Sequence, residues 1–153
     1  MQTKTDKIVA ELIVAYWMEM ETLQNYLAHS QNLDGVRAEE IKKALAADIP
    51  VELGHATQLA GRIRVLDGQV PGSLQFKATQ RYLQPPAEST DVVSVIKGVI
   101  QAEEGAIEQY NQLIKLSDGI DYATQDLCIR ILANEEDHRR EFKGFLREYE
   151  KLR

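Results

Sequence analysis

The sequence has one cysteine, four prolines and no long uninterrupted apolar run. The single cysteine, Cys128, excludes an internal disulfide framework and a paired-cysteine metal site, and it makes a reducing cytosol the expected compartment. The longest apolar stretch, residues 8–20, is interrupted by Glu11 and Glu19 and is shorter than the roughly 20 residues that cross a bilayer. It also lacks the features of a signal peptide. We therefore expect a cytoplasmic protein with no membrane partner.

Positive charge is also scarce, because 18 Lys and Arg residues stand against 24 Asp and Glu residues, for a formal net charge of -6. This charge repels a phosphate backbone, and no run of basic residues forms a tail or stripe. We therefore expect no nucleic-acid partner. A carboxylate-rich surface would concentrate divalent cations, although solubility alone explains the same charge.

Four long segments repeat apolar residues at steps of three and four, which predicts helices with one buried face. They cover about residues 6–33, 37–66, 89–116 and 121 to the C-terminus. Thr5 or Asp6 is the expected N-cap of the first, and Ser89 or Thr90 that of the third. Pro50 predicts a kink or a local loosening within the second. Almost nothing resembles a strand, so residues 1–153 are expected to form one all-α domain.

The connections predict the topology of these helices. Short turns follow the first and third helices, so each of the two successive pairs should form an antiparallel hairpin. The middle link, residues 67–88, is much longer than usual between adjacent bundle helices and contains several glycines and prolines. It should therefore run the length of the bundle. The sequence predicts a four-helix bundle with one long crossover between the second and third helices.

Each predicted helix carries a carboxylate in the middle of its apolar stripe, where an apolar side chain is expected. These four carboxylates belong to Glu19, Glu52, Glu103 and Glu135. A buried carboxylate without a partner costs several kcal/mol, and neither Lys nor Arg lies near these positions on the stripes. Metal ions are the simplest species that would neutralise them.

Two histidines complete the pattern, because His55 and His138 each lie three residues after a core glutamate and so share its helix face. One Glu-x-x-His motif alone is a weak signal in a Glu-rich helical protein. Two such motifs, with a lone core glutamate on each remaining helix, match the ligand set of a carboxylate-bridged di-iron or di-manganese site. The predicted metal ligands and catalytic residues are Glu19, Glu52, His55, Glu103, Glu135 and His138.

At these residues the sequence resembles the ferritin superfamily, and within it the bacterioferritins, over nearly the whole chain. Glu19 and Tyr26, seven residues apart, are similar to the first-helix ligand of that family and its neighbouring tyrosine. Glu103 and Tyr110 repeat the spacing, and residues 131–138 resemble the fourth-helix pattern. The resemblance implies a ferritin-like bundle and places both tyrosines beside the metal ligands. Redox activity of these tyrosines is one possibility, and packing against a core carboxylate is the commoner role.

The resemblance also implies how the ligands divide between two iron ions, with manganese or zinc as alternatives that the same ligand types accept. Glu52 and Glu135 would bridge both ions. Glu19 and His55 would complete one ion, and Glu103 and His138 the other.

Three departures from the family pattern modify these expectations. Bacterioferritins that bind haem between subunits carry Met after the second-helix glutamate, and Leu53 in that position predicts no haem. The sequence ends with the fourth helix, so we expect no fifth helix of the kind that lines a pore in 24-subunit cages. Ala106 stands where rubrerythrin-like peroxidases have a further glutamate, which argues against that relative.

The function that the resemblance implies is ferroxidase activity, in which Fe(II) is oxidised to Fe(III) by O2 or H2O2 for iron storage or detoxification. The expected assembly is a homo-oligomer, at least a dimer and possibly a cage. The alternatives are a non-storing di-iron or di-manganese oxidase or peroxidase, a DNA-protecting miniferritin, which the acidic charge disfavours, and a metal-free interaction module, which the buried carboxylates disfavour.

Three side-chain positions outside the ligand set carry their own expectations. Asp48 lies one turn before Glu52, and we expect it at a solvated bundle end rather than on an iron entry route. His29 lies near the end of the first helix and should cap it or face solvent. The acidic residues off the stripes should be solvated, namely Glu104, Glu108, Glu136 and Asp137.

Overall fold

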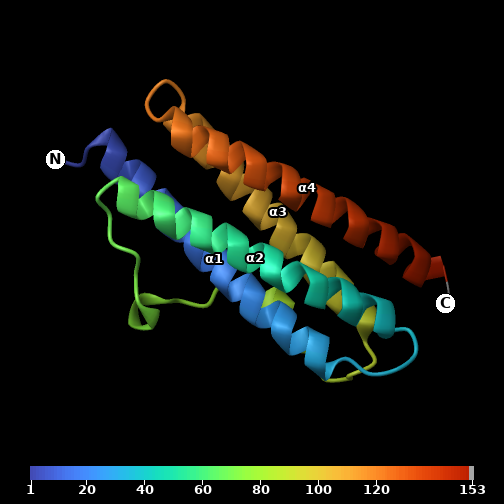
Figure 1. Cartoon of the computed structure of the whole chain (residues 1–153). Helices are drawn as coiled ribbons and strands as arrows, with labels where there is room; N and C mark the ends of the chain where they lie inside the picture. Colours follow the sequence, from blue (N-terminus) through green and yellow to red (C-terminus); the bar gives the residue numbers. More distant parts are fainter. Residues whose placement is uncertain (152–153) are drawn as a thin grey trace.

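The structure is a computed structural model that describes residues 1–151. Four α-helices form an elongated bundle, and no strand occurs in this part of the chain (Figure 1). They are α1 (Lys4–Asn32), α2 (Glu39–Val65), α3 (Val92–Ser117) and α4 (Tyr122–Lys151). Two 3-10 turns, η1 (Ser73–Gln75) and η2 (Arg81–Leu83), lie in the link between α2 and α3. The predicted all-α bundle is confirmed, and the last two residues of the predicted fourth helix fall outside the described residues. That residues 1–153 form a single domain stays a prediction.

The helices begin at caps that differ from those expected. Thr3 caps α1 in a reciprocal capping box, because its hydroxyl accepts from the Asp6 backbone and the Asp6 carboxylate accepts from the Thr3 backbone. Asp91 caps α3, since its carboxylate accepts from both the backbone N–H and the hydroxyl of Ser94. α2 runs through Pro50 as one helix, and the exposed position of Pro50 keeps its ring out of the core.

The crossover, residues 67–88, runs along the bundle and is fastened to α1 (Figure 1). The Glu21 carboxylate accepts hydrogen bonds from the Thr79 and Gln80 backbones at 2.8 to 3.0 Å and from the Thr79 hydroxyl at 3.1 Å. The Asn25 amide donates to the Gln80 side chain at 2.9 Å. These bonds replace the water that a buried carboxylate would lose, so Glu21 needs no cation. The predicted crossover topology is confirmed.

His29 is also covered by the crossover, which corrects the expectation that it faces solvent. It is fully buried, and its Nε2 lies 2.7 Å from the Leu83 carbonyl oxygen. Burial lowers its pKa more than this hydrogen bond raises it, so the imidazole stays neutral at pH 7. Gly98 of α3 lets η2 approach, because a side chain there would meet the Tyr82 carbonyl oxygen at 2.5 Å.

The apolar core consists of two separate clusters at opposite ends of the bundle. One contains Leu45, Ile96 and Phe142, and the other contains Leu12 and Leu59. Between them lies a layer of buried carboxylates and imidazoles. Within residues 1–151 no helix combines the length and the apolar character that a membrane span requires.

Candidate metal centre

The six predicted ligands lie together in the polar layer, and every helix contributes to it. α1 and α3 each present one glutamate, while α2 and α4 each present a Glu-x-x-His pair. The four carboxylates are at most 2% exposed and the His55 residue is 3% exposed, whereas the His138 side chain is 11% exposed. Because each residue sits in mid-helix, its backbone is satisfied by the helix and only its side chain needs a partner.

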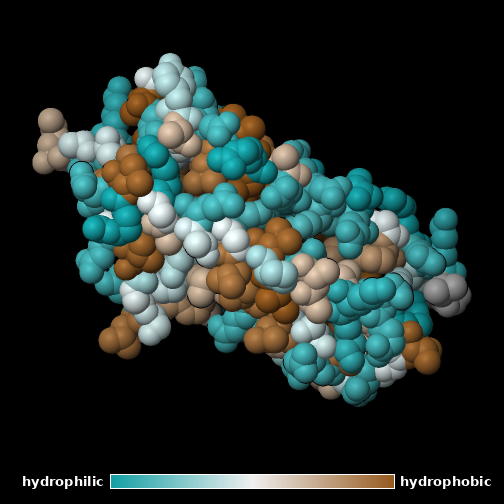
Figure 2. Space-filling model, viewed as in Figure 1, coloured by the Kyte–Doolittle hydropathy of each residue, from teal (hydrophilic) through white to brown (hydrophobic). Residues whose placement is uncertain are grey.

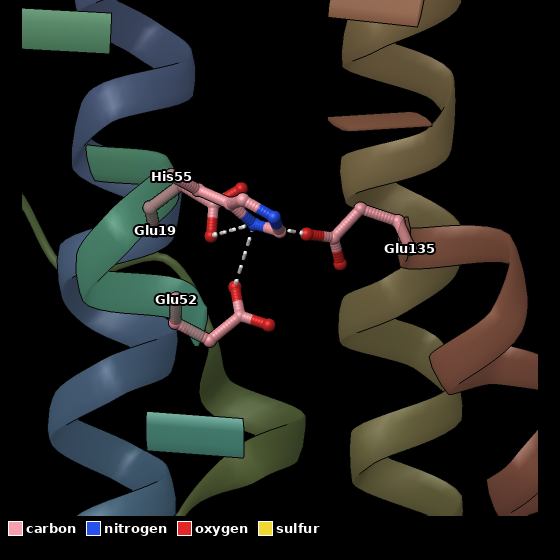
Figure 3. A group of neighbouring side chains, drawn as sticks. All are labelled: Glu19, Glu52, His55 and Glu135. Carbon is pink, nitrogen blue, oxygen red and sulfur yellow. Dashed lines mark ion pairs between the residues drawn. The ribbon is translucent and has the colours of Figure 1, made fainter. Parts of the chain in front are cut away.

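The first group of ligands surrounds His55. Its Nδ1 lies 2.9 Å from Oε1 of Glu135, 3.6 Å from Oε2 of Glu19 and 3.7 Å from Oε2 of Glu52. Figure 3 shows these carboxylates converging on the imidazole from three different helices. One ligand atom from each residue lies within 4.8 Å of the others, close enough for a single ion to contact all four.

The second group surrounds His138. Its Nδ1 lies 3.2 Å from Oε1 of Glu52, 3.8 Å from Oε1 of Glu103 and 3.9 Å from Oε2 of Glu135. These four residues also offer ligand atoms within 4.8 Å of one another.

Glu52 and Glu135 belong to both groups and divide their oxygens between them. Glu52 turns Oε2 toward His55 and Oε1 toward His138. Glu135 does the same, with Oε1 toward His55 and Oε2 toward His138. A carboxylate that gives one oxygen to each of two neighbouring positions has the arrangement of a bridging ligand. The structure therefore brings together all six side chains in the two sets that the resemblance implied.

Two buried tyrosines hold the remaining glutamates across the bundle. The Tyr26 hydroxyl donates to Oε1 of Glu103 at 2.6 Å, and the Tyr110 hydroxyl donates to Oε1 of Glu19 at 2.5 Å. Burial, followed by the charge of the nearest carboxylate, raises the pKa of both phenols well above the usual value. Both hydroxyls therefore keep their protons and act as donors.

Several polar atoms in this layer have no hydrogen-bond partner, although each is buried. In residues 1–151 the buried side-chain atoms of this kind are His29 Nδ1, Glu52 Oε1, His55 Nδ1, Glu103 Oε2, Glu135 Oε1 and His138 Nδ1. All but the first point into the cluster of ligands. Native proteins rarely leave such atoms unpaired, and carboxylate oxygens and imidazole nitrogens are good ligands for iron, manganese and zinc. The donor set thus fits a pair of metal ions.

The charges of the cluster lead to the same conclusion. Among the described residues, no Lys or Arg forms an ion pair with these four glutamates, and their ion-pair partners are His55 and His138. Burial lowers the pKa of each imidazole, but the neighbouring glutamates outweigh it and raise the pKa to about 10 for His55 and about 11 for His138. Protons therefore compensate the carboxylates, and metal ions would compete with these protons.

The carboxylates themselves differ in proton affinity. Burial, with the charge of Glu52 next, raises the pKa of Glu19 to about 8. Burial and then the charges of Glu19 and Glu52 raise the pKa of Glu135 well above its usual value. Burial also acts against ionisation of Glu52, but the neighbouring side chains of Glu19, His138 and His55 outweigh it and lower its pKa. Glu52 is thus the carboxylate that stays charged most readily among these three.

Two side chains that the sequence reasoning did not place at the site lie directly outside the imidazoles. Oδ1 of Asn134 is 3.0 Å from Nε2 of His55, and Oδ1 of Asp48 is 3.6 Å from Nε2 of His138. The Asp48 side chain is 13% exposed, so its expected place at a solvated bundle end is wrong. Its position one turn before Glu52 on the same helix face was the available signal. Burial raises the pKa of Asp48 to about 6, despite the opposing charge of His138.

Comparison with known proteins agrees with this architecture. The family described as the ferritin-like domain matches residues 12–152. The chain belongs to this family. A curated relative of this ferritin-like chain is the DNA protection during starvation protein of Pyrococcus furiosus, 28% identical over 144 residues that make up 92% of this chain and 77% of the relative.

Solved structures share the fold of this ferritin-like chain. The bacterioferritin-related dodecameric thioferritin of Bacteroides fragilis superposes with a TM-score of 0.85 at 21% identity, over 99% of this chain and 90% of its own. The bacterioferritin of Desulfovibrio desulfuricans has a TM-score of 0.83 at 23% identity, over 97% and 83%. A ferritin-like di-iron-carboxylate protein of Bacillus anthracis str. Ames gives 0.83 at 20% identity, over 95% and 99%.

Proposed function

We propose that this protein is a ferroxidase that oxidises Fe(II) to Fe(III) at the centre formed by Glu19, Glu52, His55, Glu103, Glu135 and His138. The observation that carries the proposal is the division of the Glu52 and Glu135 oxygens between two groups of ligands. It supports binding of two ions side by side rather than one ion alone. Membership of the ferritin-like family supports the same chemistry.

Two Fe(II) ions are the substrate, and the oxidant is O2 or H2O2. Each Fe(II) gives up one electron, so a pair reduces O2 to H2O2 with the uptake of two protons, or H2O2 to two water molecules with the same uptake. Binding both ions next to each other supplies both electrons to one oxidant molecule. Carboxylate-rich ligands favour the harder Fe(III) product over Fe(II).

The protein's own residues hold this geometry. The tyrosine hydroxyls fix one oxygen of Glu19 and one of Glu103, which limits how far these carboxylates can swing. His55 and His138 present Nδ1 to the centre and keep Nε2 outside it. The apolar clusters on either side exclude water, which strengthens the electrostatic interactions in the layer.

The test is Fe(II) oxidation under air, followed by absorbance, for the wild type and a Glu52→Ala, Glu135→Ala double variant. Glu136→Ala is the matched control, because Glu136 is the exposed neighbour of Glu135 on the same helix. We expect fast oxidation by the wild type and the control and only the buffer rate in the double variant. Equal rates for all three proteins would refute the assignment of the centre.

Storage is the finer part of the proposal, and the non-storing oxidase or peroxidase is its alternative. Gel filtration of the iron-loaded protein separates the two. A large assembly that retains many irons per chain supports storage or detoxification, whereas saturation near two metals per chain supports a retained di-iron or di-manganese cofactor. Loading with Mn(II) or Zn(II) in place of Fe(II) then tests which metal the centre prefers.

DNA protection is a second candidate, favoured by the name of the Pyrococcus furiosus relative. The net charge of -6 opposes direct binding of DNA, although removal of Fe(II) and H2O2 would protect DNA without contact. A gel-shift assay at low salt tests contact. Survival of plasmid DNA exposed to Fe(II) and H2O2 tests protection, with the double variant as the control.

We also propose that the protein acts as a homo-oligomer, at least a dimer. Several large apolar side chains are exposed on α1, α2 and the crossover, including Leu27, Leu53 and Leu74. Figure 2 shows hydrophobic patches among the hydrophilic surface on the face that carries α2 and the crossover. Light scattering of the wild type and a Leu27→Asp, Leu53→Asp variant tests this, and a smaller assembly in the variant is expected.

A further inference from the structure

We propose that Asp48 and Asn134 are positioning residues that make the two metal positions unequal, with the His138 position binding a divalent cation more tightly than the His55 position. The inference rests on the metal centre proposed above. It depends on the side chains that contact the outer nitrogen of each imidazole, which differ in charge.

Both imidazoles are oriented in the same way. Nδ1 of His55 faces glutamate oxygens from 2.9 Å, and Nδ1 of His138 faces them from 3.2 Å. A histidine that binds a metal through Nδ1 in its neutral form carries its one proton on Nε2. Nε2 of each ring must therefore donate outward, toward the oxygen that lies there.

The two outer oxygens belong to different chemical groups. Nε2 of His55 lies 3.0 Å from the amide oxygen of Asn134, which is neutral. Nε2 of His138 lies 3.6 Å from a carboxylate oxygen of Asp48, which carries negative charge when ionised. At 3.6 Å the Asp48 oxygen acts on His138 through its charge, which makes the imidazole more basic than a neutral amide does.

The wider surroundings add to the difference. The carboxylates whose charge acts on Asp48 are Glu141, Glu103 and Asp137. Glu103 is itself a ligand and Asp137 is paired with Arg140, so within residues 1–151 Glu141 is the unpaired one outside the ligand set. The charges that act on His55 come from Glu19 and Glu52, which are themselves ligands. A cation at the His138 position therefore feels additional negative charge from outside the ligand set.

Solvent exposure acts in the opposite direction, which makes the inference testable. The His138 side chain is 11% exposed and the His55 side chain is 4% exposed. If access to water decided the affinities, the His138 position would be the weaker one. Substitution of such outer partners alters metal affinity about 10-fold to 100-fold, which is large enough to outweigh a small difference in exposure.

The experiment is an anaerobic Co(II) titration followed by visible absorption and calorimetry, because Co(II) reports its coordination through its spectrum and is not oxidised under these conditions. For the wild type we expect two binding steps. Asp48→Asn, which keeps the shape and removes the charge, should weaken the tighter step about 10-fold. Asn134→Asp should strengthen the weaker step and reduce the difference in affinity between the two steps. Because Asn134 is exposed, this substitution is expected to leave the fold intact.

Asp137→Asn is the matched control, since Asp137 is an exposed acid on α4 next to His138 and pairs with Arg140. It tests whether any nearby charge has the same effect. A gain of affinity in Asn134→Asp is a result that a merely structural defect does not produce. Restored tight binding in Asp48→Glu would show that the carboxylate, rather than the side-chain length, is responsible.

Three outcomes would overturn the inference. In the first, Co(II) binds in two steps whose affinities neither substitution changes. This result leaves the metal centre intact but removes the roles of Asp48 and Asn134. Another is an equal loss at both steps in Asp48→Asn, or the same loss in Asp137→Asn, which indicates a general effect of structure or charge. The third is a wild type that binds no Co(II), which removes both the inference and the proposed centre.

Discussion

The ends and the middle of the bundle are built on opposite physical principles. At each end, fully buried aliphatic side chains such as Leu45 and Leu59 pack into an apolar cluster. In the middle, at most 2% exposed, lie four carboxylates that would repel one another if all were charged. The ends contribute stability through burial, whereas the middle costs stability unless protons or cations compensate its charge.

This difference teaches that the side chains that stabilise the fold and the side chains that could bind metal lie in different layers of the molecule. One apolar cluster packs the helices together on each side of the polar layer. The spacing of the helices within that layer therefore follows from the packing at the two ends. Side chains in the layer are then oriented by neighbours, as the tyrosine hydroxyls show. Substitutions at the ends should lower stability without changing the proposed metal centre, and substitutions of the six candidate ligands should change metal binding.

The largest effect is expected from Leu59→Ala, one turn after His55 in α2. Removal of a fully buried leucine side chain should lower the free energy of unfolding by about 2 to 5 kcal/mol, through lost burial and the cavity left behind. Leu45→Ala, in the other cluster, is the matched variant. Urea unfolding measures the loss, and Co(II) stoichiometry measures the centre. A variant that stays folded but binds no metal would break the distinction between ends and middle.

The next largest effect is expected from metal binding in the polar layer. Zn(II) at about 100 times its dissociation constant should raise the free energy of unfolding by about 2.7 kcal/mol if it binds only the folded protein. Leu59→Ala should keep this increase, because its substitution lies outside the ligand set, and the Glu52→Ala, Glu135→Ala variant should lose it. Thermal unfolding with and without a chelator measures the increase. An increase of the same size in the double variant would place the metal elsewhere.

Much of this comparison could be predicted from the sequence, because it depends on periodicity. The step of three and four residues identifies the face of each helix that meets the others, and a glutamate on that face is conspicuous. All six predicted ligands were found in this way, and the structure brings them together.

Residues covered by the crossover could not be predicted in the same way. Glu21 and His29 lie off the stripe of α1, and they are buried only because residues 79–83 pack over them. Helix periodicity carries no information about where an irregular segment lies. Asn134 was missed for a related reason, since it is exposed and only its amide oxygen reaches His55.

A smaller effect on stability is expected from the two tyrosines that lie between the polar layer and the apolar clusters. Tyr110→Phe removes the hydrogen bond to Glu19 and leaves a buried carboxylate oxygen without its donor, at a cost of about 1 to 3 kcal/mol. Tyr26→Phe removes the reciprocal bond to Glu103 and should cost a similar amount. Chemical unfolding of both variants measures the loss. If only one of the two variants is destabilised, the two tyrosine–glutamate hydrogen bonds contribute unequally to stability.

The smallest effect is expected outside both the apolar clusters and the polar layer, where Asp121 joins α2 to the start of α4. Its carboxylate accepts from the Thr124 backbone at 3.1 Å and pairs with Arg62 at 2.9 Å. Burial raises the pKa of Asp121, but the Thr124 hydrogen bonds and then the Arg62 guanidinium outweigh it and hold the pKa below the usual value. Asp121→Asn keeps an acceptor for the helix start and removes the charge, so the loss should be about 0.5 to 1 kcal/mol at pH 7.

The pH dependence of this loss has a definite sign. Because the pKa of Asp121 is lower in the folded than in the unfolded chain, its contribution is complete above the ordinary aspartate pKa of about 3.9 and disappears as the pH falls through the folded value. The difference in unfolding free energy between wild type and Asp121→Asn should therefore shrink between about pH 5 and pH 3. Measured on metal-free protein, the same difference should be smaller in an Arg62→Gln background, since that substitution removes the partner cation. A difference that persists unchanged at pH 3 would mean that hydrogen bonding at the helix start, rather than charge, is what Asp121 contributes.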